Sequence, residues 1–223
     1  MNLTPDAIVY FQRGFFTLNA TLVFSWVVMG VIIGVVLLLT RNLSSGKKVS
    51  KRQAFLEMIV FGIRKQIRQI AAQDPAPYLP FLGSLFLFIS ISNLLDLVPF
   101  YEPPTSSLSV TGALAICVFF AVPVFGVRAL GVKRYLKQYI EPSFVMLPFN
   151  IISELSRTLA LAVRLFGNIM SGSLLVAVLI SIVPLFVPLV MQALGLLIGQ
   201  IQAYIFAALA TVYIASGTSK EET

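Results

Sequence analysis

Six polar side chains recur along one apolar segment, and their types could hold and guide a charge inside a membrane. Five of them lie in ELSRTLALAVRLFGNIMSG, residues 154–172, and the sixth lies four residues before it; most of the other residues there are apolar. Each residue of an α-helix advances by about 100°, so all six side chains fall within roughly 100° of arc. They are Asn150, Glu154, Arg157, Arg164, Asn168 and Ser171. A stripe of this length indicates a functional face rather than an accident of register.

The arginines are the costly members of this stripe. A charge at the centre of a membrane costs from about 3 to more than 10 kcal/mol, and arginine does not become neutral by losing its proton. Glu154 can pair with Arg157, three residues further along the helix. Arg164 has no acid one turn before or after it, so its countercharge must come from water, another segment or another protein. It either snorkels or pairs structurally with Asp96, or it faces a moving charge.

A matching surface is predicted on the last apolar segment. Five of its residues fall within roughly 80° of one another on a helix. They are Gln192, Gly195, Gly199, Gln202 and Phe206. Glycines four residues apart let helices approach closely, although they can also be packing residues only. The amide of Gln202 can donate to or accept from a polar partner inside the membrane, whereas Gln200 is predicted to point elsewhere.

The composition places the chain among polytopic membrane proteins. Of its 223 residues, 58% are hydrophobic and only 11% are charged, and the mean hydropathy is +0.93. These values lie far outside the range of soluble globular domains. There is no phosphate-binding GxxxxGK[ST] loop, no histidine and no convincing zinc site, so neither a cofactor nor a metal is expected. The net charge of +7 is assigned to cytoplasmic loops and not to nucleic-acid binding.

We expect an all-α fold that forms a single membrane domain over residues 1–223, with five transmembrane crossings. Each apolar stretch is long enough for a hydrocarbon core about 30 Å thick. The expected crossings are residues 18–40, 78–100, 108–127, 144–183 and 190–215. Residues 53–71 are predicted to form an amphipathic helix that lies at the interface or docks on a partner, because Phe55, Ile59, Ile63, Ile67 and Ile70 share one face.

Basic residues predict the orientation of these crossings. Between Arg41 and Arg68 there are eight Lys or Arg residues and one acid, Glu57. A second basic stretch follows residue 127, and both stretches are expected to be inner loops. The loop YEPPTSSLS has no basic residue and suits the outer side. The N-terminus is therefore expected outside and the C-terminus inside.

The fourth apolar stretch is too long to stand upright. Residues 144–183 would form a helix about 60 Å long, roughly twice the thickness of the hydrocarbon core. The segment must therefore be steeply tilted or broken. Tilts beyond about 40° are uncommon for helices that face lipid, so a steep tilt would require a protein partner beside the helix.

Three motifs carry a resemblance to a known family. "LAVRLFGNIMSG", "IQAYIFAALATVYI" and "SNLLDLVP" resemble subunit a of the F-type ATP synthase, the membrane stator and ion-channel subunit. The first crossing, "LNATLVFSWVVMG", is similar to that of the cyanobacterial and chloroplast form. The resemblance covers nearly the whole chain. It implies a non-catalytic subunit whose two long helices lie inclined against a rotating c-ring.

The resemblance also implies roles for single residues. Arg164 matches the essential arginine that faces the ring carboxylates, Gln202 the glutamine opposite it, and Asn168 the asparagine of the same motif. Arg157 stands where relatives carry Lys, Arg or Gln, and Glu154 stands near an acid of the cyanobacterial and chloroplast pattern. Asn93 and Asp96 match the pair of polar residues on the second helix of the family.

One departure from the family pattern concerns the outer ion path. Nine residues after the arginine the family commonly has Glu, and here the residue is Ser173. The position that compensates in some relatives is Gly195. An outer path would then use water, Ser173, or the acids Asp96 and Glu102. The transported ion is left open between H⁺ and Na⁺, because Na⁺ needs oxygen ligands and no proton relay.

The function implied is ion translocation through two offset half-channels, with Arg164 preventing a short circuit. The expected partners are the c-ring, the subunit b peripheral stalk, the other ATP synthase subunits and the lipid bilayer, with no nucleic acid. The expected location is the bacterial inner membrane, with a thylakoid membrane as the alternative. A secondary transporter with a midplane site at Arg164 and Gln202 is the other function considered, although such folds usually show repeated halves and none is seen here.

Overall fold

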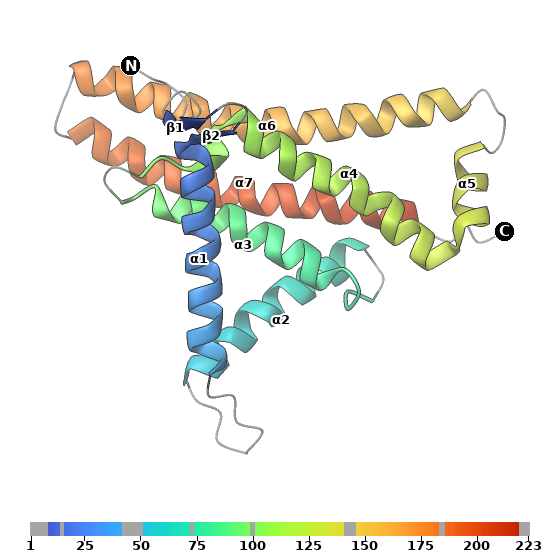
Figure 1. Cartoon of the computed structure of the whole chain (residues 1–223). Helices are drawn as coiled ribbons and strands as arrows, with labels where there is room; N and C mark the ends of the chain where they lie inside the picture. Colours follow the sequence, from blue (N-terminus) through green and yellow to red (C-terminus); the bar gives the residue numbers. More distant parts are fainter. Residues whose placement is uncertain are drawn as a thin grey trace.

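The computed structural model describes residues 9–13, 16–41, 51–71, 74–98, 101–140, 146–182 and 186–218. Long helices make up most of these ranges (Figure 1). They are α1 (Ala20–Thr40), α2 (Lys51–Ala71), α3 (Leu79–Leu95), α4 (Leu108–Leu130), α5 (Val132–Ile140), α6 (Met146–Ile182) and α7 (Phe186–Thr218). A short 3-10 helix, η2 (Pro104–Ser106), lies between α3 and α4. The predicted all-α polytopic membrane class is confirmed.

A short antiparallel hairpin precedes α1, and the sequence analysis did not predict it. Its strands are β1 (Val9–Arg13) and β2 (Phe16–Asn19), with Phe11 opposite Leu18. Four of the described helices, including α1, are long and apolar enough to cross a membrane. The apolar helix α3 has 17 residues and is therefore about 26 Å long, at the lower limit for a crossing. A total of five crossings stays a prediction.

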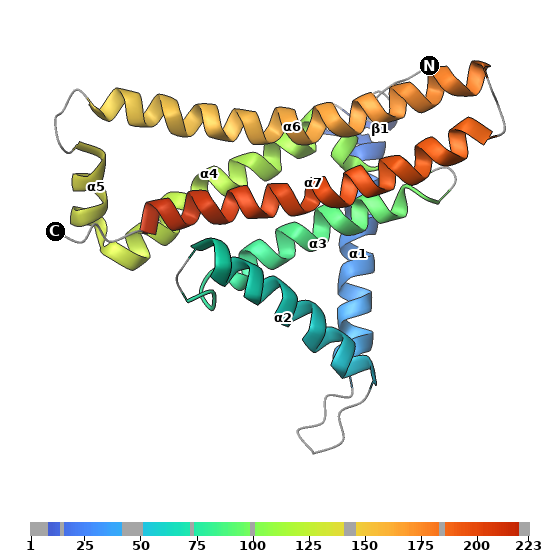
Figure 2. The same ribbon diagram turned by 180° about the vertical axis from the view of Figure 1, so that it is seen from behind.

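The two longest helices are continuous and lie side by side. α6 has 37 residues and α7 has 33, so they are about 56 Å and 50 Å long. The sequence left open whether residues 144–183 form a steeply tilted helix or a broken one. The described part, Met146–Ile182, is one helix without a break. Figures 1 and 2 show both helices running across the direction of α1. Because both exceed the thickness of a hydrocarbon core, they must be strongly inclined inside a membrane.

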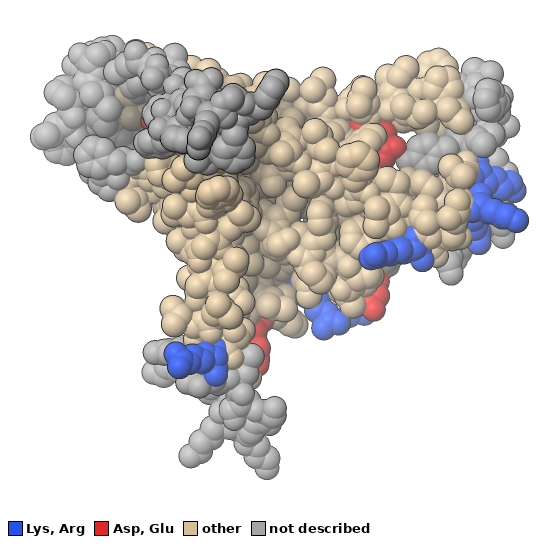
Figure 3. All heavy atoms as spheres, viewed as in Figure 1, with Lys and Arg blue, Asp and Glu red and all other residues tan. Residues whose placement is uncertain are grey.

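The core is built from apolar faces that repeat every three or four residues. On α7 the buried side chains include Ala203, Phe206, Ala210 and Ile214. Leu161 and Leu165 of α6 belong to the same buried cluster, in which α3 and α4 also pack against α7. By contrast, much of α1 stays exposed, as expected for a helix that faces lipid. Charged side chains occupy little of the described surface (Figure 3).

Helix α5 replaces part of a predicted loop. The sequence analysis placed residues 128–137 in an inner loop, but α4 ends before Gly131 and a new helix begins at Val132. Gly131 has φ of 83°, a conformation that glycine adopts without steric cost. Tyr135 on α5 is buried and lies against Gly126 of α4. The tyrosine ring can pack there because Gly126 has no side chain to occupy the space.

Gly126→Ala is expected to destabilise the protein. A Cβ atom at this position would lie 2.6 Å from Cδ2 of Tyr135 and 2.9 Å from the carbonyl oxygen of Gly217. Overpacking of this kind costs about 1–3 kcal/mol, so the thermal midpoint of the purified protein in detergent should fall. Gly112→Ala is the matched control on the same helix, because nothing lies within 4 Å of its Cβ position. An equal or higher midpoint for Gly126→Ala would contradict the close approach.

Candidate functional site

The polar stripe of α6 meets the predicted surface of α7 where Asn168 contacts Gln202. The Nδ2 atom of Asn168 donates to Oε1 of Gln202 over 3.4 Å. Gln202 is 4% exposed, and its Nε2 atom is buried without an acceptor among the residues that the structure describes. A buried amide donor left without a partner costs about 1–3 kcal/mol. The Nε2 atom of Gln202 can therefore donate a hydrogen bond to water or to a group from outside this chain.

Arg164 lies one helical turn before Asn168 and is exposed. Within the described ranges, no residue forms a hydrogen bond or an ion pair with its guanidinium. The structural alternative of a pair between Arg164 and Asp96 is therefore not supported. The same exposed face of α6 carries the small residues Ala160, Gly167 and Ser171. A permanent cation thus stands on a surface with little side-chain bulk around it.

The first part of the stripe has other contacts. The guanidinium carbon of Arg157 lies 5.7 Å from the centre of the Tyr213 ring, within the range of a cation–π interaction. Glu154 is half-buried, and its backbone carbonyl accepts from Oγ1 of Thr158. Ser173 lies in α6, but its side chain falls outside the described residues. Arg157 therefore has a partner on α7, in contrast to Arg164.

A cleft of about 360 Å³ opens between α3, α6 and α7, and we call it the polar cleft for four polar side chains in an otherwise apolar lining. Its polar lining residues are Asn93, Asp96, Asn168 and Gln192. The Nε2 atom of Gln192 donates to the backbone oxygen of Asp96 over 3.4 Å. Asn168 belongs both to this cleft and to the contact with Gln202. Asn93 and Asp96 therefore line the same cleft as Asn168, the residue of α6 that contacts Gln202 of α7. Gly195 also lines this cleft.

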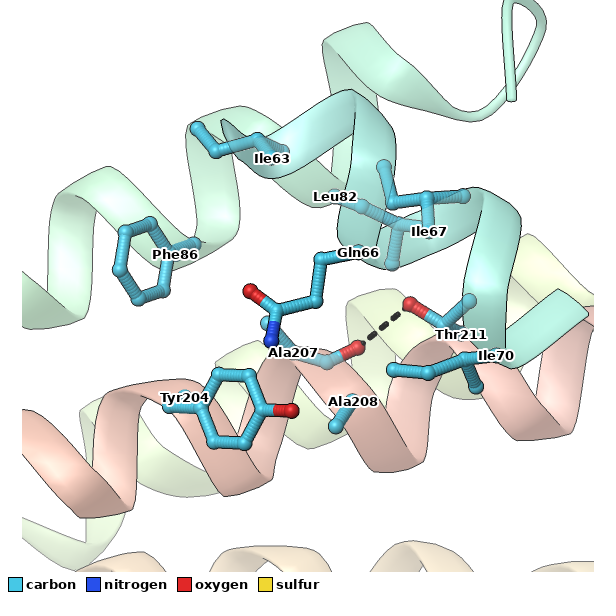
Figure 4. A pocket seen from close by; sticks show the side chains of 10 residues that line it. All are labelled: Ile63, Gln66, Ile67, Ile70, Leu82, Phe86, Tyr204, Ala207, Ala208 and Thr211. Atoms are coloured by element: carbon cyan, nitrogen blue, oxygen red, sulfur yellow. Dashed lines mark hydrogen bonds between the residues drawn. The ribbon is translucent and has the colours of Figure 1, made fainter. Parts of the chain in front are cut away.

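A second, mainly apolar pocket lies along α7, where residues 204–211 contribute to its lining (Figure 4). It has a volume of about 40 Å³, enough for a water molecule. Ile63, Ile67 and Ile70 of α2 face it, and the Thr211 hydroxyl bonds to the Ala207 carbonyl at 2.7 Å. The C-terminal part of the apolar face predicted for α2 therefore docks on α7 and α3 of its own chain, whereas Phe55 at the other end of that face is exposed.

The sequence analysis missed a hydrogen-bonded clamp between α3 and α7. The Ser90 hydroxyl donates to Oε1 of Gln200 over 2.5 Å, and Nε2 of Gln200 returns a bond to the Ser90 carbonyl over 2.9 Å. Asn93 donates from Nδ2 to the Gly199 carbonyl over 2.7 Å. Polar side chains inside apolar helices commonly make such interhelical bonds, which is the signal that could have identified Ser90 and Gln200. The clamp holds α7 at Gly199 and Gln200, just before Gln202.

The loop predicted on the outer side is folded into the protein. Residues 103–107 are buried, and Thr105 and Ser107 have no exposed surface. The Thr105 hydroxyl donates to Oδ1 of Asn93 over 3.2 Å, so this segment holds the Asn93 amide in the orientation that reaches α7. Glu102 is half-buried beside it and does not line the cleft among the described residues. Burial raises the pKa of Tyr101 to about 12, so the phenol stays protonated at physiological pH.

Comparison with known proteins decides the family. The sequence model of the family described as ATP synthase A chain matches residues 22–215, most of the chain and all of the site. The chain belongs to this family. Members of the family are non-catalytic membrane subunits, in agreement with the absence of a predicted catalytic site.

Several curated relatives align over nearly their whole length. The chain is 56% identical over 222 residues to "ATP synthase subunit a 2" of Acaryochloris marina, covering 100% of this chain and 95% of the relative. It is 56% identical to "ATP synthase subunit a" of Albidiferax ferrireducens, with 98% and 94% covered. For "ATP synthase subunit a 1" of Prosthecochloris aestuarii the identity is 53%, with 100% of both chains covered.

Gly199→Ala is expected to impair coupled ion transport, whereas Gly112→Ala on α4 is not. A Cβ atom at Gly199 would lie 3.1 Å from Nδ2 of Asn93, but nothing lies within 4 Å of a Cβ atom at Gly112. The first substitution would push Asn93 off the Gly199 carbonyl and shift Gln202 relative to Asn168. We expect a severalfold loss of ATP-driven ion uptake by inverted membrane vesicles. Equal rates for the two variants would contradict the proposed role of the clamp.

Proposed function

We propose that this chain is the ion-translocating stator subunit of a rotary F-type ATP synthase. Arg164 would face the carboxylates of a c-ring and separate two offset half-channels. The observation that carries the proposal is the placement of Arg164, which is exposed on an apolar helix without a partner among the described residues. A fixed charge in this setting requires a countercharge from outside the chain. Family membership favours this function over the secondary transporter.

The chemistry follows from the cost of charge in hydrocarbon. A ring carboxylate that faces lipid must be neutral, by protonation or by bound Na⁺. Beside Arg164 it can ionise, because a nearby fixed cation lowers the pKa of a carboxyl group. The permanent positive charge of the guanidinium also repels a cation that would cross directly between the two sides. The membrane potential then supplies about 2.3 kcal/mol per charge per 100 mV to bias rotation.

The polar cleft is the candidate for one half-channel. It runs from Asp96, at the end of α3, to Asn168, and its volume admits several water molecules. Asp96 is the only acid among its lining residues within the described part of the chain. We propose that Asp96 takes the place in ion entry that Glu holds in relatives at the position of Ser173. The ion is H⁺ or Na⁺, and the ring supplies the ligands that select it.

The small residues beside Arg164 favour a helical partner. Ala160, Gly167 and Ser171 would let a neighbouring helix approach the backbone of α6 closely, so that the carboxylate of that helix could reach the guanidinium. We propose that this partner is the c-ring, and that subunit b and the other synthase subunits complete the assembly. The proposed location is the bacterial inner membrane, with the N-terminus outside and the C-terminus in the cytoplasm.

Arg164→Ala is expected to abolish coupled ATP synthesis by the purified complex reconstituted in vesicles. Loss of the fixed cation removes both the pKa effect on the ring carboxylate and the barrier between the half-channels. The measurement is ATP formed under an imposed ion gradient, together with the amount of complex that assembles. Arg157→Ala is the matched control and should retain much of the activity, because Arg157 is held by Tyr213. Synthesis at the normal rate by an assembled Arg164→Ala complex would disprove the role.

Gly167→Leu is expected to abolish ATP synthesis without lowering the stability of the subunit itself. Nothing lies within 4 Å of a Cβ atom at Gly167, so the chain alone can accommodate the side chain, but a ring helix passing Arg164 could not. Gly30→Leu on α1 is the matched control, because it is equally open and lies away from α6. Normal synthesis by the Gly167→Leu complex would show that no partner approaches this face.

A further inference from the structure

Helix α5 and the end of α4 form a basic cluster that the proposed ion path does not use. Its members are Arg128, Lys133, Arg134 and Lys137, all exposed. The sequence has no Asp or Glu from residue 103 to residue 140, and the next acid is Glu141. The local charge is therefore strongly positive over one short helix.

The helix is amphipathic, and both of its faces reach the surface. Lys133, Lys137 and Arg134 fall within about 100° of arc on α5. Val132 and Leu136 lie within about 40° of each other beside this arc and are 58% and 55% exposed. A helix that carries cations next to uncovered apolar side chains is suited to the boundary between headgroups and acyl chains.

The protein holds α5 in a fixed position. Tyr135 is only 5% exposed and occupies the space left by Gly126, close to Gly217 of α7. α5 also packs against α6. Figures 1 and 2 place α5 at the end of the bundle where α4 and α7 end and α6 begins. The basic cluster is thus presented by a docked helix and not by a freely moving loop.

Other exposed basic side chains lie along the same margins of the molecule. On the face drawn in Figure 3 the Lys and Arg atoms lie along the lower and right-hand margins, and the described surface at the upper left shows none. Arg157 and Arg164 of α6 belong instead to the site described above. An excess of Lys and Arg marks the cytoplasmic side of a membrane protein. With the orientation proposed above, α5 then faces the inner leaflet.

We propose that α5 is a docking site for anionic phospholipid headgroups of the inner leaflet. Arg128, Lys133 and Arg134 would bind the phosphate groups, and Val132 and Leu136 would enter the adjacent acyl-chain boundary. Basic clusters directly after a membrane-spanning helix are attracted to anionic lipid surfaces. The exposed apolar pair favours lipid over an acidic protein segment, because charge pairing alone would leave that pair uncovered. Bound lipid would fix the depth at which α6, the helix of Arg164, begins.

The test uses a probe on the apolar face of α5 in the intact synthase complex. In a Cys117→Ser background, Leu136→Cys is labelled with a thiol-reactive fluorophore, and the complex is placed in nanodiscs that contain brominated phosphatidylglycerol or brominated phosphatidylcholine at equal fractions. We expect the anionic lipid to quench at least about twofold more strongly, because each nearby cation adds attraction to it. With Lys133→Gln and Arg134→Gln the two lipids should quench equally.

Two controls separate a specific site from general attraction. The preference at position 136 should survive Arg64→Gln with Lys65→Gln, which remove two exposed cations from α2. A fluorophore on Val27→Cys of α1, which is 45% exposed and lies far from the basic residues that follow α1, should show no preference. Equal quenching by both lipids with the basic residues intact would overturn the proposal. So would a preference that persists without Lys133 and Arg134, or a probe that neither lipid quenches because protein covers it.

Discussion

A permanent charge that cannot be neutralised inside a membrane is the constraint on which the site depends. Arg164 keeps its proton in hydrocarbon, and the chain supplies no partner for it among the described residues. α6 therefore has to expose the guanidinium toward another molecule while a different part of its surface packs into the core. Leu161 and Leu165, about 60° and 100° around the helix from Arg164, make this packing contact. The inclined helix presents Arg164 sideways.

The amides beside Arg164 need a rigid support, and buried hydrogen bonds provide it. Asn93 reaches the Gly199 carbonyl, and Thr105 holds the Asn93 amide from behind. Gln200 exchanges two bonds with Ser90 on the same pair of helices. In hydrocarbon such groups have no water to replace a lost partner, so the bonds fix α7 against α3. Gln202 then projects toward Asn168 from a helix whose rotation is already set.

Local sequence patterns predicted the elements well where a helix acts independently. Residues 18–40 and 108–127 were expected as crossings and form most of α1 and α4, because a long apolar run needs no tertiary contact to be helical in a membrane. The β1–β2 hairpin and α5 were missed, since short segments depend on what they touch. The ring of Tyr135 packs α5 against α4 at Gly126, where no side chain occupies the space. The burial of residues 103–107 was missed for a similar reason, because a polar segment becomes buried only when partners satisfy its hydrogen bonds.

The sequence alone determined the membrane class, the polar stripe and the residue types of the site, because helical periodicity and the cost of buried charge act locally. It also determined the family, through the motifs around Arg164 and Gln202. Only the tertiary structure decided which of these residues meet. Asn168 contacts Gln202, and Arg157 contacts Tyr213. Asp96 lines the cleft and does not pair with Arg164. These outcomes depend on the relative rotation and register of separate helices, and no periodicity within a single helix specifies them.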